Sequence, residues 1–199
     1  MSCGKQSRSD NYEKSFLKIT GLLSPSWDGR TINCGRRIKG FYFMIKVMFV
    51  CHGNICRSPM AEYLFKDMVK KKGREKDFYI KSSATSYEEI GNPVHYGTER
   101  ILTSLNIDCS DKRAQKLTKE DGEKYDYFIG MDEENLYFMR KILGTKYYDK
   151  IFLLLEFAGE SRNVADPWYT GDFEKTYSDV KKGLEKFYEY AINNARELS

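Results

Sequence analysis

The stretch VCHGNICRSP, residues 50–59, places two cysteines, an arginine and a serine within eight positions. Cysteine is a nucleophile in its thiolate form, and the planar guanidinium of arginine pairs with two oxygens of a phosphate group. Four kinds of site remain open for such a stretch: a metal knuckle, a redox pair, a helix cap, or the cradle and nucleophile of a catalytic site. The neighbouring elements must decide between them.

The sequence on either side indicates a loop between a strand and a helix. An apolar run, 45–50, precedes the loop, and a segment of helical pattern, 58–71, follows it. Backbone N–H groups of such a loop and the positive end of the helix dipole converge on one point and favour an anion there. We expect Gly53 to adopt a backbone conformation that other residues resist, and Pro59 to fit the first helical turn. The stretch therefore predicts an anion-binding loop.

Within this loop, Cys51 is the candidate nucleophile. The loop N–H groups and the Arg57 guanidinium favour its thiolate, and a thiolate below a bound phosphate is placed for in-line attack on phosphorus. The hydroxyl of Ser58 either caps the helix or donates to the sulfur. The alternative is that Cys51 and Cys56 are small buried residues and that Arg57 is a surface charge. The position of the whole string between a strand and a helix favours the catalytic interpretation.

Cleavage of a phosphorus–oxygen bond also needs an acid that protonates the leaving oxygen. The candidate is Asp166, in the stretch ADPWYTGDF. Pro167 makes the backbone rigid beyond it, and Trp168 and Tyr169 would partly desolvate the carboxyl group, which favours its neutral form. The alternative is that Asp-Pro only starts a turn before the last helix. The residues alone leave both interpretations open.

Short apolar runs alternate with amphipathic segments from Met44 onward, which predicts βαβ units and a parallel sheet covered on both faces. Ligands of such sheets bind at the carboxyl ends of the strands, where the loop 50–58 lies. The last helix carries an apolar stripe at spacings of three and four residues. The predicted strands are 45–50, 78–82, 126–130 and 150–155, and the predicted helices are 58–71, 93–105, 118–123, 132–142 and 172–195.

The net charge of +4 is unevenly distributed along the 199 residues. Residues 1–43 hold eight lysines and arginines against three acidic residues, which leaves −1 for the rest. We expect a basic, flexible extension at 1–43, or the product of an upstream start codon, and the catalytic domain at 44–199. The nearly neutral domain does not indicate nucleic-acid binding, and the chain has no apolar run long enough for a membrane helix.

Cysteines and histidines limit the other kinds of site. Five cysteines form no paired framework and no secretory segment precedes them, so we expect a reducing cytoplasm. A zinc site would have to combine Cys51 and Cys56 with His52 or His95, and no second Cys/His pair follows. We therefore expect neither a metal nor a cofactor.

Four stretches in order resemble the low-molecular-weight protein tyrosine phosphatases, from Met44 to about Asn194. VCHGNICRSPMAE resembles the phosphate-binding loop of that family, and SSATSYEEIGNPVH (82–95) its first rim loop. LTKEDGEKYDYFIGMDEENL (117–136) is similar to an internal segment, and DPWYTGDFEKTY (166–177) resembles the general-acid loop. Residues 1–43 have no counterpart.

The resemblance implies a flavodoxin-like, three-layer α/β fold with a four-stranded parallel sheet and helices on both faces. It also implies metal-free hydrolysis of phosphotyrosine through a cysteinyl-phosphate on Cys51, with Asp166 as general acid and then base, and Arg57 as the charge stabiliser. Asn54 would hold the strained shape of the loop, with Ser58 and Ser82 as its hydrogen-bond partners, and Cys56 would be a redox partner of the nucleophile. The implied phosphate-binding residues are His52, Gly53, Asn54, Ile55, Cys56, Arg57 and Ser58, and the implied supporting or rim residues are Ser82, Tyr87, Glu88, Trp168 and Tyr169.

Two positions depart from the family pattern. Glu88 stands where the first rim loop often has an aromatic residue, although Tyr87 is adjacent, and this change disfavours acidic peptides. Leu105 stands where some members have a histidine that supports the phosphate loop, so we expect part of that network to be missing. His52 fits a rim contact better than a catalyst.

Three other functions compete with phosphotyrosine hydrolysis. A protein arginine phosphatase shares the scaffold but carries threonine at the Ile55 position. An arsenate reductase would need further redox cysteines, and only Cys109 lies downstream. A non-catalytic phosphate-binding module would lack Cys51 or Asp166. We expect a phosphotyrosine protein or an aryl phosphate as the partner, no nucleic acid or membrane, and a monomer or weak dimer.

Overall fold

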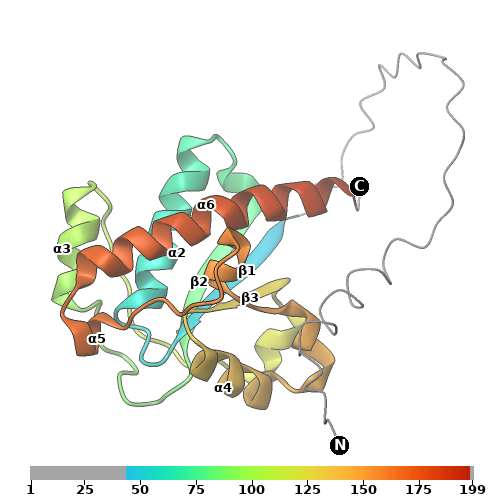
Figure 1. Ribbon diagram of the computed structural model, residues 1–199, viewed down its shortest axis with the longest axis horizontal. Helices are drawn as coiled ribbons and strands as arrows, with labels where there is room; N and C mark the ends of the chain where they lie inside the picture. The colour runs from blue at the N-terminus through green and yellow to red at the C-terminus, as the bar shows by residue number, and fades with distance from the viewer. Residues whose placement is uncertain (1–43, 198–199) are drawn as a thin grey trace, which may run out of the picture. The chain divides into compact units, whose positions relative to one another are not determined.

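The computed structural model describes residues 44–197, and the predicted extension at 1–43 lies outside them. Four strands form one parallel sheet in the order β2-β1-β3-β4, so their carboxyl ends share one edge (Figure 1). This arrangement confirms the predicted fold class. The strands are β1 (Ile45–Cys51), β2 (Phe78–Ala84), β3 (Tyr127–Gly130) and β4 (Ile151–Leu153).

Helices cover both faces of this sheet. α2 and α6 pack on one face and α4 on the other (Figure 1). None of the helices found in 44–197 has the length and apolar character that crossing a membrane requires. The α-helices are α2 (Arg57–Lys71), α3 (Tyr96–Ser104), α4 (Glu133–Leu143), α5 (Pro167–Thr170) and α6 (Phe173–Glu197), and the 3₁₀ helices are η1 (Glu75–Asp77), η2 (Lys119–Glu123), η3 (Thr145–Lys150) and η4 (Leu154–Ala158).

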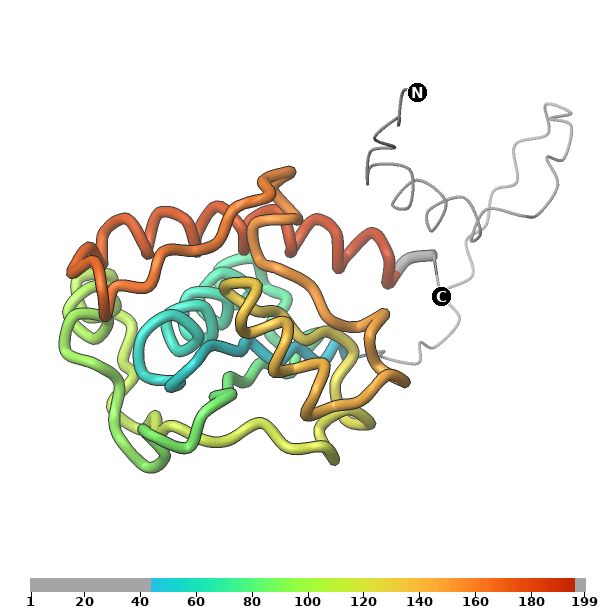
Figure 2. Tube along the Cα trace, turned by 60° about the horizontal axis from the view of Figure 1, so that its bottom comes forward, coloured from blue at the N-terminus to red at the C-terminus, as the bar shows by residue number. Residues whose placement is uncertain are grey.

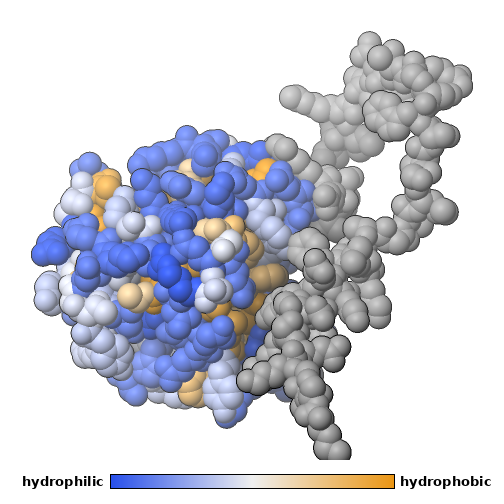
Figure 3. Space-filling model, in the orientation of Figure 1, coloured by the Kyte–Doolittle hydropathy of each residue, from blue (hydrophilic) through white to orange (hydrophobic). Residues whose placement is uncertain are grey.

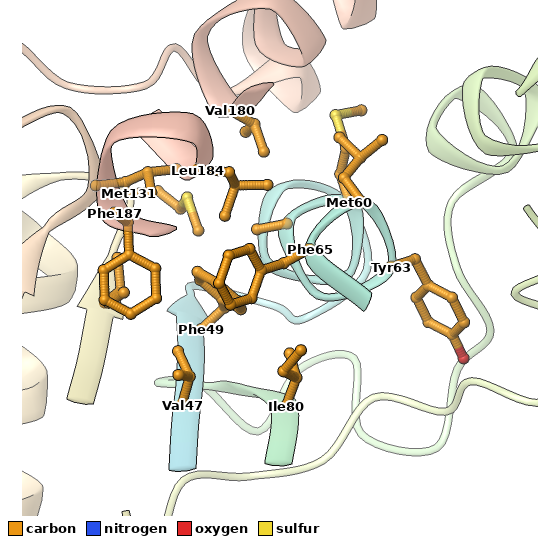
Figure 4. Packing of buried hydrophobic residues seen from close by; sticks show 14 of the residues in the cluster. Val47, Phe49, Met60, Tyr63, Phe65, Ile80, Met131, Val180, Leu184 and Phe187 are labelled. Atoms are coloured by element: carbon orange, nitrogen blue, oxygen red, sulfur yellow. The ribbon is translucent and has the colours of Figure 1, made fainter. Parts of the chain in front are cut away.

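The central strand β1 is apolar except for the exposed Lys46 near its start, because both faces of the rest of the strand are buried. Alternate side chains point to opposite faces: Val47 and Phe49 join the cluster under α2 and α6, and Met48 and Val50 join the cluster under α4. Figure 4 shows Val47 and Phe49 directed toward the first cluster. The strand is thereby held from both sides at the point where its last residue, Cys51, enters the site.

The apolar stripe predicted for the last helix is confirmed in α6. Its side chains point to the sheet, where Phe187 packs against the rings of Phe49 and Phe65 (Figure 4). The face of the molecule drawn in Figure 3 is mostly hydrophilic, with apolar residues in small groups. The buried residues of the stripe are Phe173, Val180, Leu184, Phe187 and Ala191.

Three predicted elements differ in the structure. The predicted helix 93–105 begins only at Tyr96, because His95 accepts the Gly97 N–H and caps α3 there. The predicted strand 150–155 ends at Leu153, because the Glu156 carboxylate accepts the Leu153 N–H at 3.1 Å and turns the chain into η4. The predicted helix 118–123 is the 3₁₀ helix η2, whose capping box holds a single tight turn. The short helices η1, η3 and α5 were not predicted.

The loop after β2, residues 85–92, lies beside the segment 105–118, as Figure 2 shows. Gly91 N–H donates to the Ala114 carbonyl at 2.9 Å, and Ala114 N–H donates to the Asn92 carbonyl at the same distance. Next to the sheet, Thr85 N–H donates to the Cys51 carbonyl at 2.9 Å. These bonds fix the rim loop next to the end of β1.

Candidate active site

A pocket of about 270 Å³ opens at the carboxyl ends of β1 and β3. The three residues predicted to carry the chemistry all line it, although Arg57 and Asp166 are 109 residues apart in the chain. The loop after β1 forms its floor, and the start of α5 forms one side. Its lining residues are Cys51, His52, Gly53, Ile55, Cys56, Arg57, Glu88, Glu89, Asp132, Glu134, Asp166, Trp168 and Tyr169.

The Cys51 sulfur is held by two hydrogen bonds. Its Sγ lies 3.0 Å from Ser58 Oγ and accepts the Asn54 N–H at 3.3 Å. Helix α2 begins at Arg57, and no side chain caps its amino end. Of the two roles left open for Ser58, the structure therefore shows the contact with sulfur, and the first N–H groups of α2 stay available to an anion.

Arg57 is only 3% exposed, and its guanidinium is paired with two carboxylates. Nη1 donates to Asp132 at 2.5 Å and to the Val164 carbonyl at 3.3 Å, and Nη2 donates to Asp166 at 2.5 Å. Burial alone would lower the pKa of Arg57, but the negative charges of Cys51, Asp166 and Asp132 outweigh it and raise the pKa. The alternative that Arg57 is a surface charge is wrong.

Both oxygens of the Asp166 carboxylate are held by hydrogen bonds. Oδ1 accepts the Trp168 N–H at 3.0 Å and so caps the short helix α5, and Oδ2 accepts from Arg57. The preceding backbone is tied to the end of β3, because Val164 N–H donates to the Met131 carbonyl at 2.8 Å. The Asp-Pro pair thus starts a helical turn and also directs its carboxylate into the pocket.

The residue of the loop with left-handed backbone is Asn54, with a φ of 59°, in agreement with the role that the family resemblance implies for it; Gly53 does not adopt such a conformation, contrary to the expectation from the loop alone. The Asn54 side chain holds the left-handed conformation: Nδ2 donates to Ser58 Oγ at 2.9 Å and to Ser82 Oγ at 2.8 Å. Asparagine tolerates left-handed backbone better than other residues with a Cβ. At Gly53 a Cβ would lie 3.0 Å from Glu89 Cγ, a tight contact that the Glu89 side chain would have to relieve by shifting.

A buried ion pair supports this loop from behind. Ser82 Oγ, which contacts Asn54, donates to Glu62 at 2.5 Å, and Glu62 pairs with Lys112 at 3.0 Å. Burial would raise the pKa of Glu62, but the charges of Lys112 and Lys66 outweigh it and lower the pKa. The pair therefore keeps a charged acceptor beneath the loop.

The departure at Leu105 lies outside this network. Leu105 ends α3 and packs against the hydrophobic core. The side-chain oxygen of Asn54, Oδ1, instead accepts the Gln115 backbone N–H at 3.0 Å, and Gln115 also donates through Nε2 to the Ser82 backbone carbonyl at 2.9 Å. Backbone and side-chain donors from the segment 105–118 complete the support of the loop.

The two cysteines of the loop are both free and buried. Burial, together with the charges of Cys51 and Asp166, raises the pKa of Cys56, which keeps that residue a neutral thiol at physiological pH. Within the described part of the chain, no group of three or more His, Cys, Asp and Glu residues is arranged to hold a metal.

The rim of the pocket combines aromatic and acidic residues. Trp168 and Tyr169 line it and are 59% and 85% exposed. His52 Nε2 lies 3.0 Å from Glu88 Oε2, so this contact joins the phosphate loop to the rim loop. Tyr87 is 78% exposed beside Lys116, and it is not among the residues that line the pocket.

Sequence reasoning missed several residues of the site, of which Asp132 has the most direct contact. It follows β3, and the carboxyl ends of neighbouring parallel strands meet at one edge, so its position was a usable signal. Glu62 and Lys112 gave no such signal, because a glutamate and a lysine 50 positions apart suggest surface charges. Glu89 and Glu134 are the other acidic residues at the pocket that were missed.

The family model described as low molecular weight phosphotyrosine protein phosphatase matches residues 46–197. This match covers most of the chain and confirms the resemblance seen in the sequence. The chain belongs to the low molecular weight phosphotyrosine protein phosphatases, and it is a phosphatase.

Individual relatives agree with this assignment. The low molecular weight protein-tyrosine-phosphatase YfkJ of Bacillus subtilis is 41% identical over 72% of this chain and 93% of its own length. Its crystal structure matches with a TM-score of 0.73 over 76% of this chain and 96% of that one, at 39% identity. A low molecular weight protein tyrosine phosphatase from Streptococcus pyogenes gives a TM-score of 0.66 at 42% identity, over 74% and 93% of the two chains.

Proposed function

We propose that this chain hydrolyses protein phosphotyrosine and small aryl phosphates in two steps through a phosphorylated Cys51, without a metal. One observation carries the proposal. A thiol, a buried guanidinium and a carboxylate from distant parts of the chain, Cys51, Arg57 and Asp166, line a single pocket at the uncapped start of α2. A nucleophile, a stabiliser of oxygen charge and a proton donor are what phosphoryl transfer needs.

In the first step, the Cys51 thiolate attacks phosphorus in line with the leaving phenol. The sulfur–phosphorus bond forms while the bond from phosphorus to the aryl oxygen breaks, and that oxygen takes the proton of Asp166. The N–H groups at the start of α2 and the Arg57 guanidinium stabilise the charge on the three remaining oxygens.

The pairing of Arg57 with Asp166 bears on how the acid is made available. A phosphate group in the pocket competes with the Asp166 carboxylate for the same Nη2 donor, since both are anions. Asp132 and the Val164 carbonyl hold Nη1 meanwhile, so the guanidinium plane stays in place. Phosphate binding thus frees Asp166 to face the leaving oxygen.

In the second step, water attacks the phosphorus of the intermediate, and Asp166 takes a proton from that water. The sulfur–phosphorus bond breaks, phosphate leaves, and the electron pair returns to the Cys51 sulfur. The Ser58 hydroxyl, 3.0 Å from that sulfur, stabilises the departing thiolate by hydrogen bonding. Ser58 is accordingly a positioning residue for the second step.

The pocket supports an aryl substrate over phosphoarginine. Ile55 lines it and offers no hydroxyl to orient water onto a phosphoamidate, and Trp168 and Tyr169 offer ring surfaces to a phenol. The test compares turnover of phosphotyrosine and phosphoarginine peptides by the wild type and by Ile55→Thr. We expect the wild type to prefer phosphotyrosine and the variant to gain phosphoarginine turnover, whereas a wild type that prefers phosphoarginine would contradict the assignment.

Cys56 fits a protective role in the same loop. A peroxide would oxidise the Cys51 thiolate to a sulfenic acid, and the Cys56 thiol would then displace water from it to form a disulfide. Activity of the wild type after brief peroxide treatment should return with a dithiol reductant. Cys56→Ser should recover much less, and equal recovery would rule out this role for Cys56.

A further inference from the structure

A second pocket, of about 380 Å³, lies next to the phosphate pocket, and Trp168 lines both. We call it the aromatic pocket, because its walls include the rings of His95, Tyr96, Trp168 and Phe173. Arg100 also lines it, and none of its lining residues within the described part of the chain is acidic. The phosphate pocket, by contrast, has five carboxylates in its lining. The two sides of Trp168 therefore differ in both charge and chemistry.

The rings of the aromatic pocket are fixed by one another. His95 stacks on Phe173 with centroids 5.1 Å apart and planes at 7°, and it meets Trp168 edge-on at 5.8 Å. The Gly97 N–H donates to His95 Nδ1 at 3.2 Å, which sets the orientation of the imidazole. Tyr96 is 72% exposed and closes one side of the pocket. A preformed aromatic surface of this kind costs little to order when it binds another ring.

The aromatic pocket is also fixed relative to the proposed nucleophile. His95 N–H donates to the Ile55 carbonyl at 2.9 Å, and the Thr98 hydroxyl donates to the Cys56 carbonyl at 3.3 Å. A peptide whose phosphotyrosine enters the phosphate pocket leaves by a mouth that Trp168 borders. An extended peptide rises about 3.3 Å per residue, so two or three of its residues span the width of the Trp168 side chain.

We propose that the aromatic pocket holds an aromatic side chain of the substrate protein, located one to three residues from the phosphotyrosine. The inference rests on the proposed function and names a specificity subsite for it. Rings favour other rings in edge-on or offset contacts, and the Arg100 guanidinium can lie against the face of the guest. A lysine at this position would meet the like charge of Arg100.

The experiment measures kcat/KM for phosphotyrosine peptides that carry Phe or Ala at each of the three positions on either side. We expect Phe to raise kcat/KM about three- to tenfold over Ala at one or more of these positions, on one side only. Tyr96→Ala should bring this ratio close to one. Tyr148→Ala is the matched control, since Tyr148 is an exposed tyrosine of η3 at the opposite edge of the sheet. The ratio within each variant cancels any change in overall activity.

Three outcomes would overturn the proposal. The first is equal kcat/KM for Phe and Ala peptides at every position in the wild type. The second is a Phe preference that Tyr96→Ala leaves unchanged. The third is a preference for Glu over Phe that Arg100→Ala abolishes, because the pocket would then recognise an acid. If the wild type cleaves all these peptides equally, the subsite is wrong and the proposed function is unaffected. If the wild type cleaves no phosphotyrosine peptide, both the subsite and the proposed function are wrong.

Discussion

The phosphate loop, residues 51–58, and the rim around its pocket are built in opposite ways. In the loop, Asn54, Arg57 and Ser58 are buried, and each makes several hydrogen bonds inside the protein. On the rim, Tyr169 is 85% exposed and the side chain of Glu88 is 71% exposed. Reacting groups must be held within a few tenths of an ångström of the geometry that the reaction needs, whereas side chains that recognise different peptides gain from conformational freedom. The difference separates a fixed reaction from an adjustable substrate preference.

The largest effect should come from the centre of the loop. Cys51→Ser replaces the sulfur with a far weaker nucleophile, so hydrolysis of p-nitrophenyl phosphate should fall to background. The anion cradle remains, and binding of inorganic phosphate, measured by calorimetry, should persist. Activity near the wild-type level would exclude Cys51 as the nucleophile.

Removal of the proposed general acid should lower kcat less than removal of the nucleophile does, and the size of the loss should depend on the substrate. Asp166→Ala should lower kcat by roughly 10²–10⁴ for phosphotyrosine, whose phenol needs a proton to leave. Aryl phosphates with strongly acidic phenols need that proton less and should lose less. A plot of log kcat against the pKa of the phenol tests this, and equal losses across the series would argue against a general acid.

Behind the loop, Glu62→Gln should reduce stability, because it leaves the charge of buried Lys112 without a partner. The expected loss in the free energy of unfolding is about 3–5 kcal/mol at pH 7. Because the folded state lowers the pKa of Glu62, its contribution is complete above the unfolded pKa of about 4.3 and is lost as the pH falls through the folded value. Urea unfolding at neutral and acidic pH should show that loss.

The exposed pair of Glu189 with Lys186 offers a control for this measurement. Glu189→Gln should change stability by less than about 1 kcal/mol, since exposed ion pairs contribute little. If Glu62→Gln and Glu189→Gln lower the free energy of unfolding equally, the buried pair does not stabilise the protein more than an exposed pair does.

The smallest effect should come from the rim. Glu88→Gln removes a negative charge at the mouth, so kcat/KM for phosphotyrosine peptides with acidic neighbours should rise about two- to fivefold at low salt. Basic peptides should gain nothing. Glu75→Gln, an exposed acid before β2, is the matched control. An equal gain in both variants would show that net charge, and not the rim, selects the peptide.

The loop was accessible to sequence reasoning because its residues are local, and local spacing is preserved when the chain folds. The same holds for the fold class, since alternating strands and helices have few ways to pack. Asp166 needed the family resemblance, because an Asp-Pro pair alone is equally a turn.

Other features of the site could not be read locally. The role of Asn54 came from the family resemblance and not from its spacing, because its partner Ser82 is 28 positions away and only the folded sheet brings the two together. The pairing of Glu62 with Lys112 likewise depends on the segment 105–118 crossing beneath the loop. Glycine was the natural guess for a strained position, and the structure shows that a bonded side chain can replace it.

The most direct test of the account is to find the phosphoryl group on the enzyme. Asp166→Ala, mixed with an aryl phosphate of good leaving group and quenched in acid within milliseconds to seconds, should carry one phosphoryl group. Fragmentation of the peptide 47–57 by mass spectrometry should place it on Cys51. An enzyme that turns over while its Cys51 stays an unmodified thiol at every time point, or that carries the group on another residue, would contradict the proposed mechanism.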